Sequence, residues 1–374
     1  MINAGASACH HTEARQKVPE SRRTPLSRKR YTAADLSAVK TSPLGERRNK
    51  VHLRDFARVC GPGATFKDFF DSLPDQLAAR DLKQIVSAVV SAYRHQKPVI
   101  WAMGAHVIKC GLSGLVIELM RRGVISAVAL NGAGAIHDFE IALIGGTSED
   151  VAAGLGAGEF GMAEETGSLI NAAINAAWRK TDHSGAEATG KTECGMGELI
   201  GRKLVEIDAP YVDQSILVAG VRLGIPVTVH VAVGTDIIHM HPSADGAALG
   251  AASYYDFRLM CGVVATLGDG GVYFNVGSAV VLPEVFLKAV TVARNLGHPV
   301  RDFTTVNLDM KDQYRSWNNV VKRPIGDHGR GFSIIGHHEL LIPLLAQSVF
   351  EQLPAAVEDS TWRGDDPGGQ TDGF

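Results

Sequence analysis

The turn Asn131-Gly132-Ala133-Gly134 follows an apolar run, and its residue types suit a bound phosphate. Glycines let the backbone approach a pyrophosphate, and the N-terminus of a helix that follows favours negative charge. The GxGxxG pattern is incomplete, because His137 stands where the third glycine would be. The turn is therefore predicted either to bind a nucleotide or to be an ordinary tight connection from a strand to a helix, which glycines serve equally well.

Two further segments could contribute to the same nucleotide site. Lys109, within residues 104–111, could neutralise a phosphate, although a loop lysine of this kind is more often simply solvated. Gly277 and Ser278 follow another apolar run and could form a second surface for the nucleotide.

His239 and His241 form an HxH pair with Asp236 close by, a spacing that can bind a metal ion. Partners in such a site would come from His337–Glu339, and the protein would then be a hydrolase that uses metal-activated water. One alternative is a polar strand end with hydrogen-bonded imidazoles. Another is a site in which Asp236 and Glu339 hold a cationic amine.

Lys322, which precedes Arg323 and Pro324, is a candidate nucleophile. A lysine that is desolvated by apolar neighbours can lose its proton and attack an imine. The alternative is a plain surface lysine, which is the usual role of a lysine in such a segment.

Apolar runs and amphipathic segments alternate through the middle of the chain and predict the elements that position these residues. The apolar spacing predicts helices over residues 82–93, 112–122, 211–223 and 283–296. Short apolar runs predict strands over residues 98–103, 124–130, 226–233, 262–267, 272–276 and 303–308, with a hairpin turn at 268–271. The alternation predicts an α/β fold with a doubly wound, mostly parallel sheet, in which ligands bind at the carboxyl ends of the strands.

Composition and charge narrow the class of protein. The 374 residues are 45% hydrophobic and carry a net charge of −3, so no global field favours nucleic acid or a membrane surface. Five scattered cysteines without a CxxC pair, no apolar run near about 18 residues and no signal-peptide pattern predict a cytoplasmic protein. We expect a basic arm over residues 1–50, one large domain over 51–353 and a tail over 354–374.

Three segments resemble the deoxyhypusine synthase family, and most closely its bacterial deoxyhypusine synthase-like branch. They are residues 104–143, 66–74 and 338–345, and the likeness extends over about residues 50–353. The resemblance implies a single Rossmann-like α/β domain and a homotetramer that binds NAD between paired subunits. It also implies oxidation of spermidine by hydride transfer to NAD, followed by transfer of an aminobutyl group through an imine to a lysine of a protein acceptor. The similar homospermidine synthases pass the group to putrescine.

The family pattern implies roles for individual residues. The family's Thr-Ala-Gly-Gly turn falls on Asn131, Gly132, Ala133 and Gly134, which would then contact NAD. Its polyamine-binding carboxylate falls on Asp236. Further cofactor contacts fall on Gly277, Ser278, Asn307 and His337.

The chain also departs from the family pattern. Ile136 and His137 replace a pair of glutamates, and the Ser-Trp-Gly-Lys motif with the catalytic lysine is missing. Lys322 lies within a few residues of its place.

The resemblance and the residues together predict an NAD-dependent enzyme of polyamine metabolism. Asp236, with Glu339 or Asp309, would hold the cationic substrate, and the acceptor would be a protein lysine or a small diamine. His239, His241 or His337 could move protons, since histidine titrates near neutral pH. Two alternatives remain, a non-catalytic NAD-binding oligomer and a metal-dependent hydrolase that uses the HxH pair.

Overall fold

The computed structural model describes residues 31–179 and 194–354. Residues 1–30 of the predicted arm and 355–374 of the predicted tail lie outside this part of the chain. The chain divides into two units, residues 1–52 and 53–374. The described part of the first unit is exposed and contains one 3-10 turn, η2 (Leu44–Glu46). The second unit contains the sheet and all the candidate site residues.

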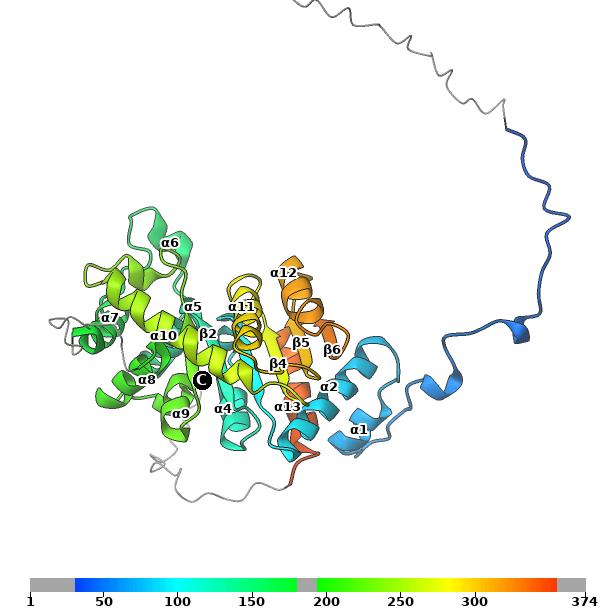
Figure 1. Cartoon of the computed structure of the whole chain (residues 1–374), viewed down its shortest axis with the longest axis horizontal. Coiled ribbons are helices and arrows are strands. Elements are labelled where there is room, and N and C mark those ends of the chain that lie inside the picture. Colours follow the sequence, from blue (N-terminus) through cyan, green and yellow to red (C-terminus); the bar gives the residue numbers. More distant parts are fainter. Residues whose placement is uncertain (1–30, 180–193, 355–374) are drawn as a thin grey trace, which may run out of the picture. The chain divides into compact units, whose positions relative to one another are not determined.

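The centre of the second unit is a six-stranded parallel sheet with the order β3-β2-β1-β4-β5-β6 (Figure 1). Its strands are β1 (Val99–Met103), β2 (Ala127–Asn131), β3 (Val227–His230), β4 (Val272–Val276), β5 (Thr304–Asp309) and β6 (Arg330–Ile335). The chain runs outward from β1 to β3, returns to the middle and runs outward again from β4 to β6. This order confirms the predicted Rossmann-like, doubly wound α/β fold.

Helices cover both faces of the sheet because alternate strand residues point to opposite sides. One face packs against α2 (Leu77–Arg94), α4 (Ser113–Arg121), α8 (Met196–Glu206), α9 (Ile216–Leu223) and α13 (His338–Phe350). The other packs against α10 (Gly246–Ala265) and α11 (Val281–Asn295). Neighbouring β4 residues show the alternation, since Phe274 stacks on Trp101 at 4.6 Å while Tyr273 stacks on Phe286 at 3.6 Å.

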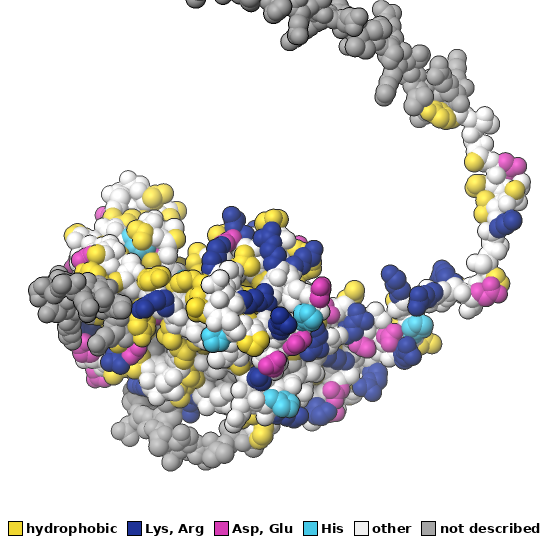
Figure 2. All heavy atoms as spheres, viewed as in Figure 1, with side chains coloured by type: hydrophobic (Ala, Val, Ile, Leu, Met, Phe, Trp, Pro, Cys, Tyr) yellow, Lys and Arg dark blue, Asp and Glu magenta, His cyan; other side chains and the backbone are white. Residues whose placement is uncertain are grey.

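Of the remaining helices, α1 (Phe66–Ser72) precedes the sheet and the others follow strands. They are α3 (His106–Lys109), α5 (Gly132–Ile144), α6 (Val151–Leu155), α7 (Glu164–Arg179), α12 (Tyr314–Ser316) and the π-helical turn Trp317–Lys322. Short 3-10 turns occur at η3 (Leu53–Asp55), η4 (Val212–Gln214) and η5 (Ile237–His239). Apolar side chains gather over the middle of the face in Figure 2, where α10 and α11 lie in Figure 1, and Tyr254 of α10 is 62% exposed. No helix in the described ranges is both long and apolar enough to cross a membrane.

A buried aspartate anchors the start of α9. Asp138, in α5, is fully buried and accepts hydrogen bonds from the Ser215 hydroxyl and from the backbone N–H groups of Ile216 and Leu217. Burial raises the pKa of Asp138 to about 6, against the lowering effect of these donors. The carboxyl group thereby satisfies the free N–H groups of the helix end.

Side chains of α10 cover the outer edge of β3. The backbone N–H of Val229 donates to the Asp256 carboxylate at 2.8 Å, and that of Val231 donates to Ser253 at 3.3 Å. Asp256 also accepts from the N–H of Gly197 at the start of α8, and burial raises its pKa to about 7. The backbone groups of this edge strand are therefore bonded within the chain rather than exposed.

Three predictions about the elements were wrong. The predicted strand over residues 262–267 is the end of α10 and the turn after it, so 268–271 connects a helix to β4 and is not a hairpin. A short apolar run cannot be assigned to a strand or a buried helix by its periodicity. The sixth strand, Arg330–Ile335, was not predicted, because its exposure varies along the strand and blurs the apolar pattern.

Candidate functional site

The candidate site lies at the carboxyl edge of the sheet, where the strand order reverses between β1 and β4. Gly104 follows β1 and Gly277 follows β4. A Cβ atom on Gly104 would overlap the carbonyl oxygen of Gly277, and the Gly104 N–H donates to Val276 at 2.9 Å. The two loops thus touch through their backbones, which requires glycine at position 104. In folds with this strand order, ligands bind where the order reverses.

The turn at residues 131–134 is closed by the protein's own side chains. Asn131 ends β2, and its side-chain oxygen accepts from the Gly134 N–H at 2.9 Å. The Asp236 carboxylate accepts from the Ala133 N–H and fills the space beside Gly132 where a side chain would lie. A pyrophosphate here would have to displace these acceptors and approach a carboxylate. The turn therefore fits a phosphate poorly, and Asp236 explains the glycine at position 132.

Asp236 and His239 form a buried pair beside this turn. Their side chains are 7% and 5% exposed, and His239 Nδ1 lies 4.0 Å from Asp236 Oδ2. His239 Nδ1 accepts from the backbone N–H groups of Gly234 and Asp236, so the neutral ring carries its proton on Nε2. Nε2 is buried and has no hydrogen-bond partner in the structure. Burial raises the pKa of Asp236, while hydrogen bonds from Thr235 and Ala133 oppose this shift.

His241 belongs to a different environment from His239. Its Nδ1 lies 2.7 Å from the Ser243 hydroxyl and its Nε2 lies 3.6 Å from Glu164. The ring packs against Gly167 of α7, where it fills the space of a side chain. Among residues 31–179 and 194–354, no three histidine, cysteine, aspartate or glutamate side chains are arranged to hold a metal ion. The metal-dependent hydrolase therefore lacks its ligand set in this part of the chain.

A row of polar side chains crosses β4, β5 and β6 on the face covered by α11. The Asn275 amide donates to Asn307 at 2.9 Å, and the Asn307 amide donates to Ser333 at 3.2 Å. Asn307 is 1% exposed, and both ends of its side chain are used in this row. Ser278 is also buried and accepts from the N–H of Leu282 in the first turn of α11. The Asn307 side chain is therefore bonded within the sheet, and its predicted contact with a cofactor stays a prediction.

Two buried acceptors without donors lie at the ends of β5 and β6. His338 is 1% exposed, and its Nε2 donates to the Leu308 carbonyl at 3.2 Å. Burial lowers the pKa of His338, so the ring is neutral and Nδ1 is a bare acceptor without a partner. Asp309 Oδ1 accepts from the Lys311 N–H, while its Oδ2 is buried without a partner. Both atoms can accept a hydrogen bond from a bound group.

His106 and Cys110, in the loop after β1, belong to this site but were not predicted from the sequence. Cys110 Sγ lies 3.3 Å from His106 Nε2 and 3.9 Å from Glu339 Oε2, and the His106 ring lies 5.5 Å from the ring of His338. Lys109 is exposed in the same loop. The spacing of a histidine and a cysteine by four residues on one helical turn was the available signal.

The remaining predicted residues lie at the surface. His337 and Glu339 have half-exposed or exposed side chains, and His337 Nδ1 lies 3.6 Å from Glu339 Oε1. Lys322 is exposed, and its ammonium group lies 5.2 Å from the centroid of the Trp317 ring. The structure thus shows no apolar enclosure of Lys322, and its nucleophilic role stays a prediction.

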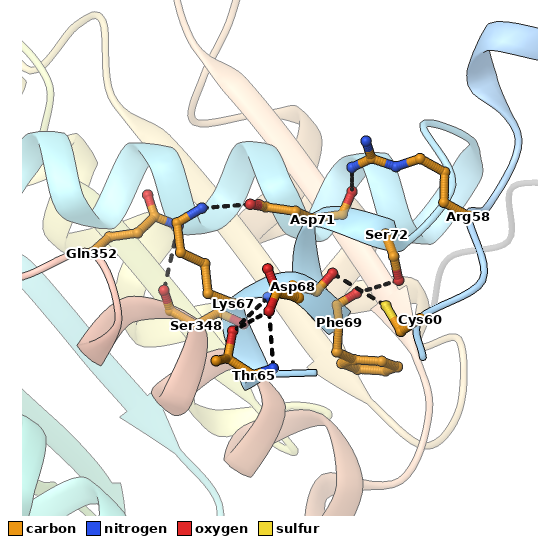
Figure 3. A network of polar contacts seen from close by, with 10 residues as sticks. All are labelled: Arg58, Cys60, Thr65, Lys67, Asp68, Phe69, Asp71, Ser72, Ser348 and Gln352. Carbon is orange, nitrogen blue, oxygen red and sulfur yellow. Dashed lines mark hydrogen bonds and ion pairs between the residues drawn. The ribbon is translucent and has the colours of Figure 1, made fainter. Parts of the chain in front are cut away.

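A cavity of about 540 Å³ lies away from the carboxyl edge, among α1, α2 and the end of α13. Figure 3 shows Lys67 and Asp71 of α1 pointing toward one another, with an Nζ–Oδ2 distance of 2.5 Å. Thr65 and Asp68 close the start of α1 with a reciprocal pair of hydrogen bonds. Lys67 and Asp71, which line the cavity, are therefore paired with each other.

Comparisons with known proteins find likeness in fold. No family model and no curated protein sequence matches the chain. Among solved structures, a candidate deoxyhypusine synthase from Entamoeba histolytica is 9% identical, with a TM-score of 0.44 over 77% of this chain and 94% of that one. A conserved LOR/SDH-type protein from Methanococcus maripaludis S2 is 15% identical, with a TM-score of 0.45 over 74% and 71%.

A third solved structure is AgrE in its ternary complex with ornithine and NAD+. It is 13% identical, with a TM-score of 0.47 over 75% of this chain and 34% of that one. The chain thus spans about a third of the length of AgrE. At these identities the likeness is one of fold and does not extend to the chemistry of the site.

Proposed function

We propose that this protein is an NAD-dependent enzyme that oxidises a cationic amine to an imine and passes the alkylamine group to an acceptor amine. The observation that carries the proposal is the reversal of strand order between β1 and β4, with acceptor side chains along the same edge of the sheet. Asp236 lies beside the end of β2, Asp309 ends β5, and Glu339 lies in the first turn of α13. The segments that resemble the deoxyhypusine synthase family lead to the same reaction.

The cofactor would lie at the β1–β4 reversal rather than at the turn 131–134, where the N–H groups of Ala133 and Gly134 are already bonded. Gly104, Gly277 and Ser278 would line it, close to the N-terminus of α11, and the exposed Lys109 could neutralise a phosphate. When bound, NAD would accept a hydride from the amine. The protein's own part is to bring the amine to this edge and to remove its protons.

The amine would be recognised by hydrogen-bond acceptors that have no donor within the protein. Asp309 Oδ2 and His338 Nδ1 are buried without partners, and an unsatisfied buried polar atom costs about 1–3 kcal/mol. An ammonium or amine group supplies N–H donors, so binding it would recover this cost. Asp236 adds a buried carboxylate, and the proton on His239 Nε2 is available to a substrate acceptor.

The acceptor amine would take the alkylamine group without an enzyme lysine at position 322, because Lys322 is exposed. A small diamine and a lysine of a protein are both chemically suitable acceptors. An assembly of four chains, as in the family that the sequence resembles, is part of this proposal.

The test has two steps. Calorimetry measures whether NAD binds, and incubation with NAD and putrescine, spermidine or spermine follows reduced cofactor by its absorbance and amine products by mass spectrometry. We expect binding and a product with at least one amine. Binding of NAD without any amine product would instead support a non-catalytic NAD-binding protein, and absence of NAD binding would remove the proposal altogether.

A further inference from the structure

We propose that Cys110 is a nucleophilic thiol, with His106 as its proton acceptor, which adds to the electrophilic carbon of an imine or aldehyde that carries a cationic amine. Cys110 Sγ lies 3.3 Å from His106 Nε2, within reach for transfer of the thiol proton. The pair lies in the loop that follows β1, at the carboxyl edge of the sheet.

The surroundings of the pair point to the kind of electrophile. The His106 ring lies 5.5 Å from that of His338, whose Nδ1 is a buried acceptor without a donor. Glu339 Oε2 lies 3.9 Å from the Cys110 sulfur. Asp309, whose Oδ2 is a second acceptor of this kind, ends β5, next to the strand β6 that precedes His338. A carboxylate beside the thiol, and a bare imidazole nitrogen on the ring next to its proton acceptor, favour an electrophile with a positively charged N–H donor.

The step needs no oxidant of its own. The sulfur forms a bond to the imine carbon, and the π pair of the C=N bond moves to the nitrogen, which takes the proton that His106 removes from the thiol. The reverse reaction regenerates the imine for attack by the acceptor amine. The inference rests on the proposed function for the source of the imine, and it gives the alkylamine group an attachment point that Lys322 does not offer.

Glu339 makes the reactivity of the Cys110 thiol depend on whether a substrate is bound. Burial raises the pKa of Cys110, and the negative charge of Glu339 raises it further. The single thiol proton can be donated either to Glu339 or to His106, so Glu339 competes with the proton acceptor. A substrate ammonium that pairs with Glu339 would remove this competition and would activate the thiol only when the site is occupied.

The test measures alkylation rates at individual cysteines of the full chain by mass spectrometry, with cationic 2-bromoethylamine and neutral iodoacetamide as probes. Cys60 is the internal control, because it is also half-buried and its thiol donates to the Asp68 carbonyl at 3.5 Å. We expect the ratio of the two rates to be about tenfold higher at Cys110 than at Cys60, which corresponds to about 1.4 kcal/mol.

Two variants separate the roles of the neighbours. His106→Gln should slow both probes at Cys110 by about tenfold or more and leave Cys60 unchanged. Glu339→Gln should abolish the preference for the cationic probe while iodoacetamide reacts faster, because the competing carboxylate is gone. Glu339 is 49% exposed, so this variant keeps the test usable if His106→Gln does not fold.

Equal rate ratios at Cys110 and Cys60, or a slower reaction of iodoacetamide in Glu339→Gln, would overturn the proposal. In a folded His106→Gln protein, unchanged rates at Cys110 would overturn it as well. Both probes react without NAD and without an amine substrate. Failure of the thiol and failure of the proposed function are therefore distinguishable.

Discussion

The carboxylate of Asp236 lies against the Cα atom of Gly132, in the space that any side chain at position 132 would occupy. Asp236 precedes a short 3-10 turn after β3, whereas Gly132 is the first residue of α5 after β2. The contact joins the ends of two neighbouring strands and brings a buried acid to a helix N-terminus, where negative charge is stabilised.

Gly132→Ala should therefore destabilise the protein by about 1–3 kcal/mol, because the added methyl group must displace the buried carboxylate. Gly114→Ala in α4 is the matched control, since a Cβ there meets nothing within 4 Å, and it should be neutral or stabilising by up to about 1 kcal/mol. Urea unfolding measures both changes. If Gly132→Ala were as stable as the parent protein, the close packing of the two residues would be wrong.

Asp309→Asn should raise the KM for the amine by about tenfold or more, because the unpaired Oδ2 no longer offers a full negative charge to the substrate. The Kd for NAD should change much less. Asp312→Asn, at an exposed position three residues later, is the control and should leave both constants unchanged. Steady-state kinetics and calorimetry give these values, and equal effects of the two variants would argue against Asp309 as an amine ligand.

Lys322→Ala should leave amine turnover unchanged. The exposed lysine contacts the Trp317 ring, so its loss should cost only about 0.5–1 kcal/mol of stability. Turnover of the purified variant, compared with Lys311→Ala at another exposed position, checks this. A loss of activity confined to Lys322→Ala would restore the nucleophilic role predicted from the sequence.

Stability should fall as the pH rises through the range in which buried Asp138 titrates. Its folded pKa of about 6 lies above the ordinary aspartate value of 3.8, so the folded state binds the proton more tightly. The free energy of unfolding then decreases between about pH 4 and pH 6, by on the order of 2–3 kcal/mol from this group. Asp256, with a pKa of about 7, extends the decrease toward neutral pH.

Asp138→Asn tests this dependence. The variant should lose about 1–3 kcal/mol near neutral pH, because one of the bonded N–H groups no longer has an acceptor. Its stability should also change less between about pH 4 and pH 6 than that of the parent protein or of Asp312→Asn. Urea unfolding at several pH values measures the effect, and an unchanged slope would contradict the raised pKa of Asp138.

The sequence predicted those parts of the fold that depend on local periodicity. The strand that ends at Met103 and the helix that faces inward through Leu82 and Val89 follow from apolar spacing alone. The end of α10 was not predicted as helix, because Val263 and Val264 are β-branched and a short apolar run can be either a strand or a buried helix. Strand order was also beyond local spacing, since it depends on contacts between distant segments.

The site was only partly predictable for the same reason. Asp236 and Glu339 were predicted as anions near strand ends, and Asp236 does lie where β3 ends while Glu339 follows β6, although their role stays a prediction. The contact of Asp236 with Gly132 joins residues about a hundred positions apart, so a glycine pattern typical of phosphate binding gave no hint of it. Local spacing could not indicate either that Cys110 lies close to Glu339, which is 229 positions later in the chain.

The bonding of Val229 and Val231 to α10 has a consequence for how this protein can meet other chains. An edge strand with free backbone groups can add a strand from a neighbouring molecule, which leads to fibres or exchanged segments. At this edge the backbone N–H groups of Val229 and Val231, which an added strand would need as donors, already donate to Asp256 and Ser253. Growth of the sheet is therefore blocked on this side, and any strand addition from another chain would have to begin at β6.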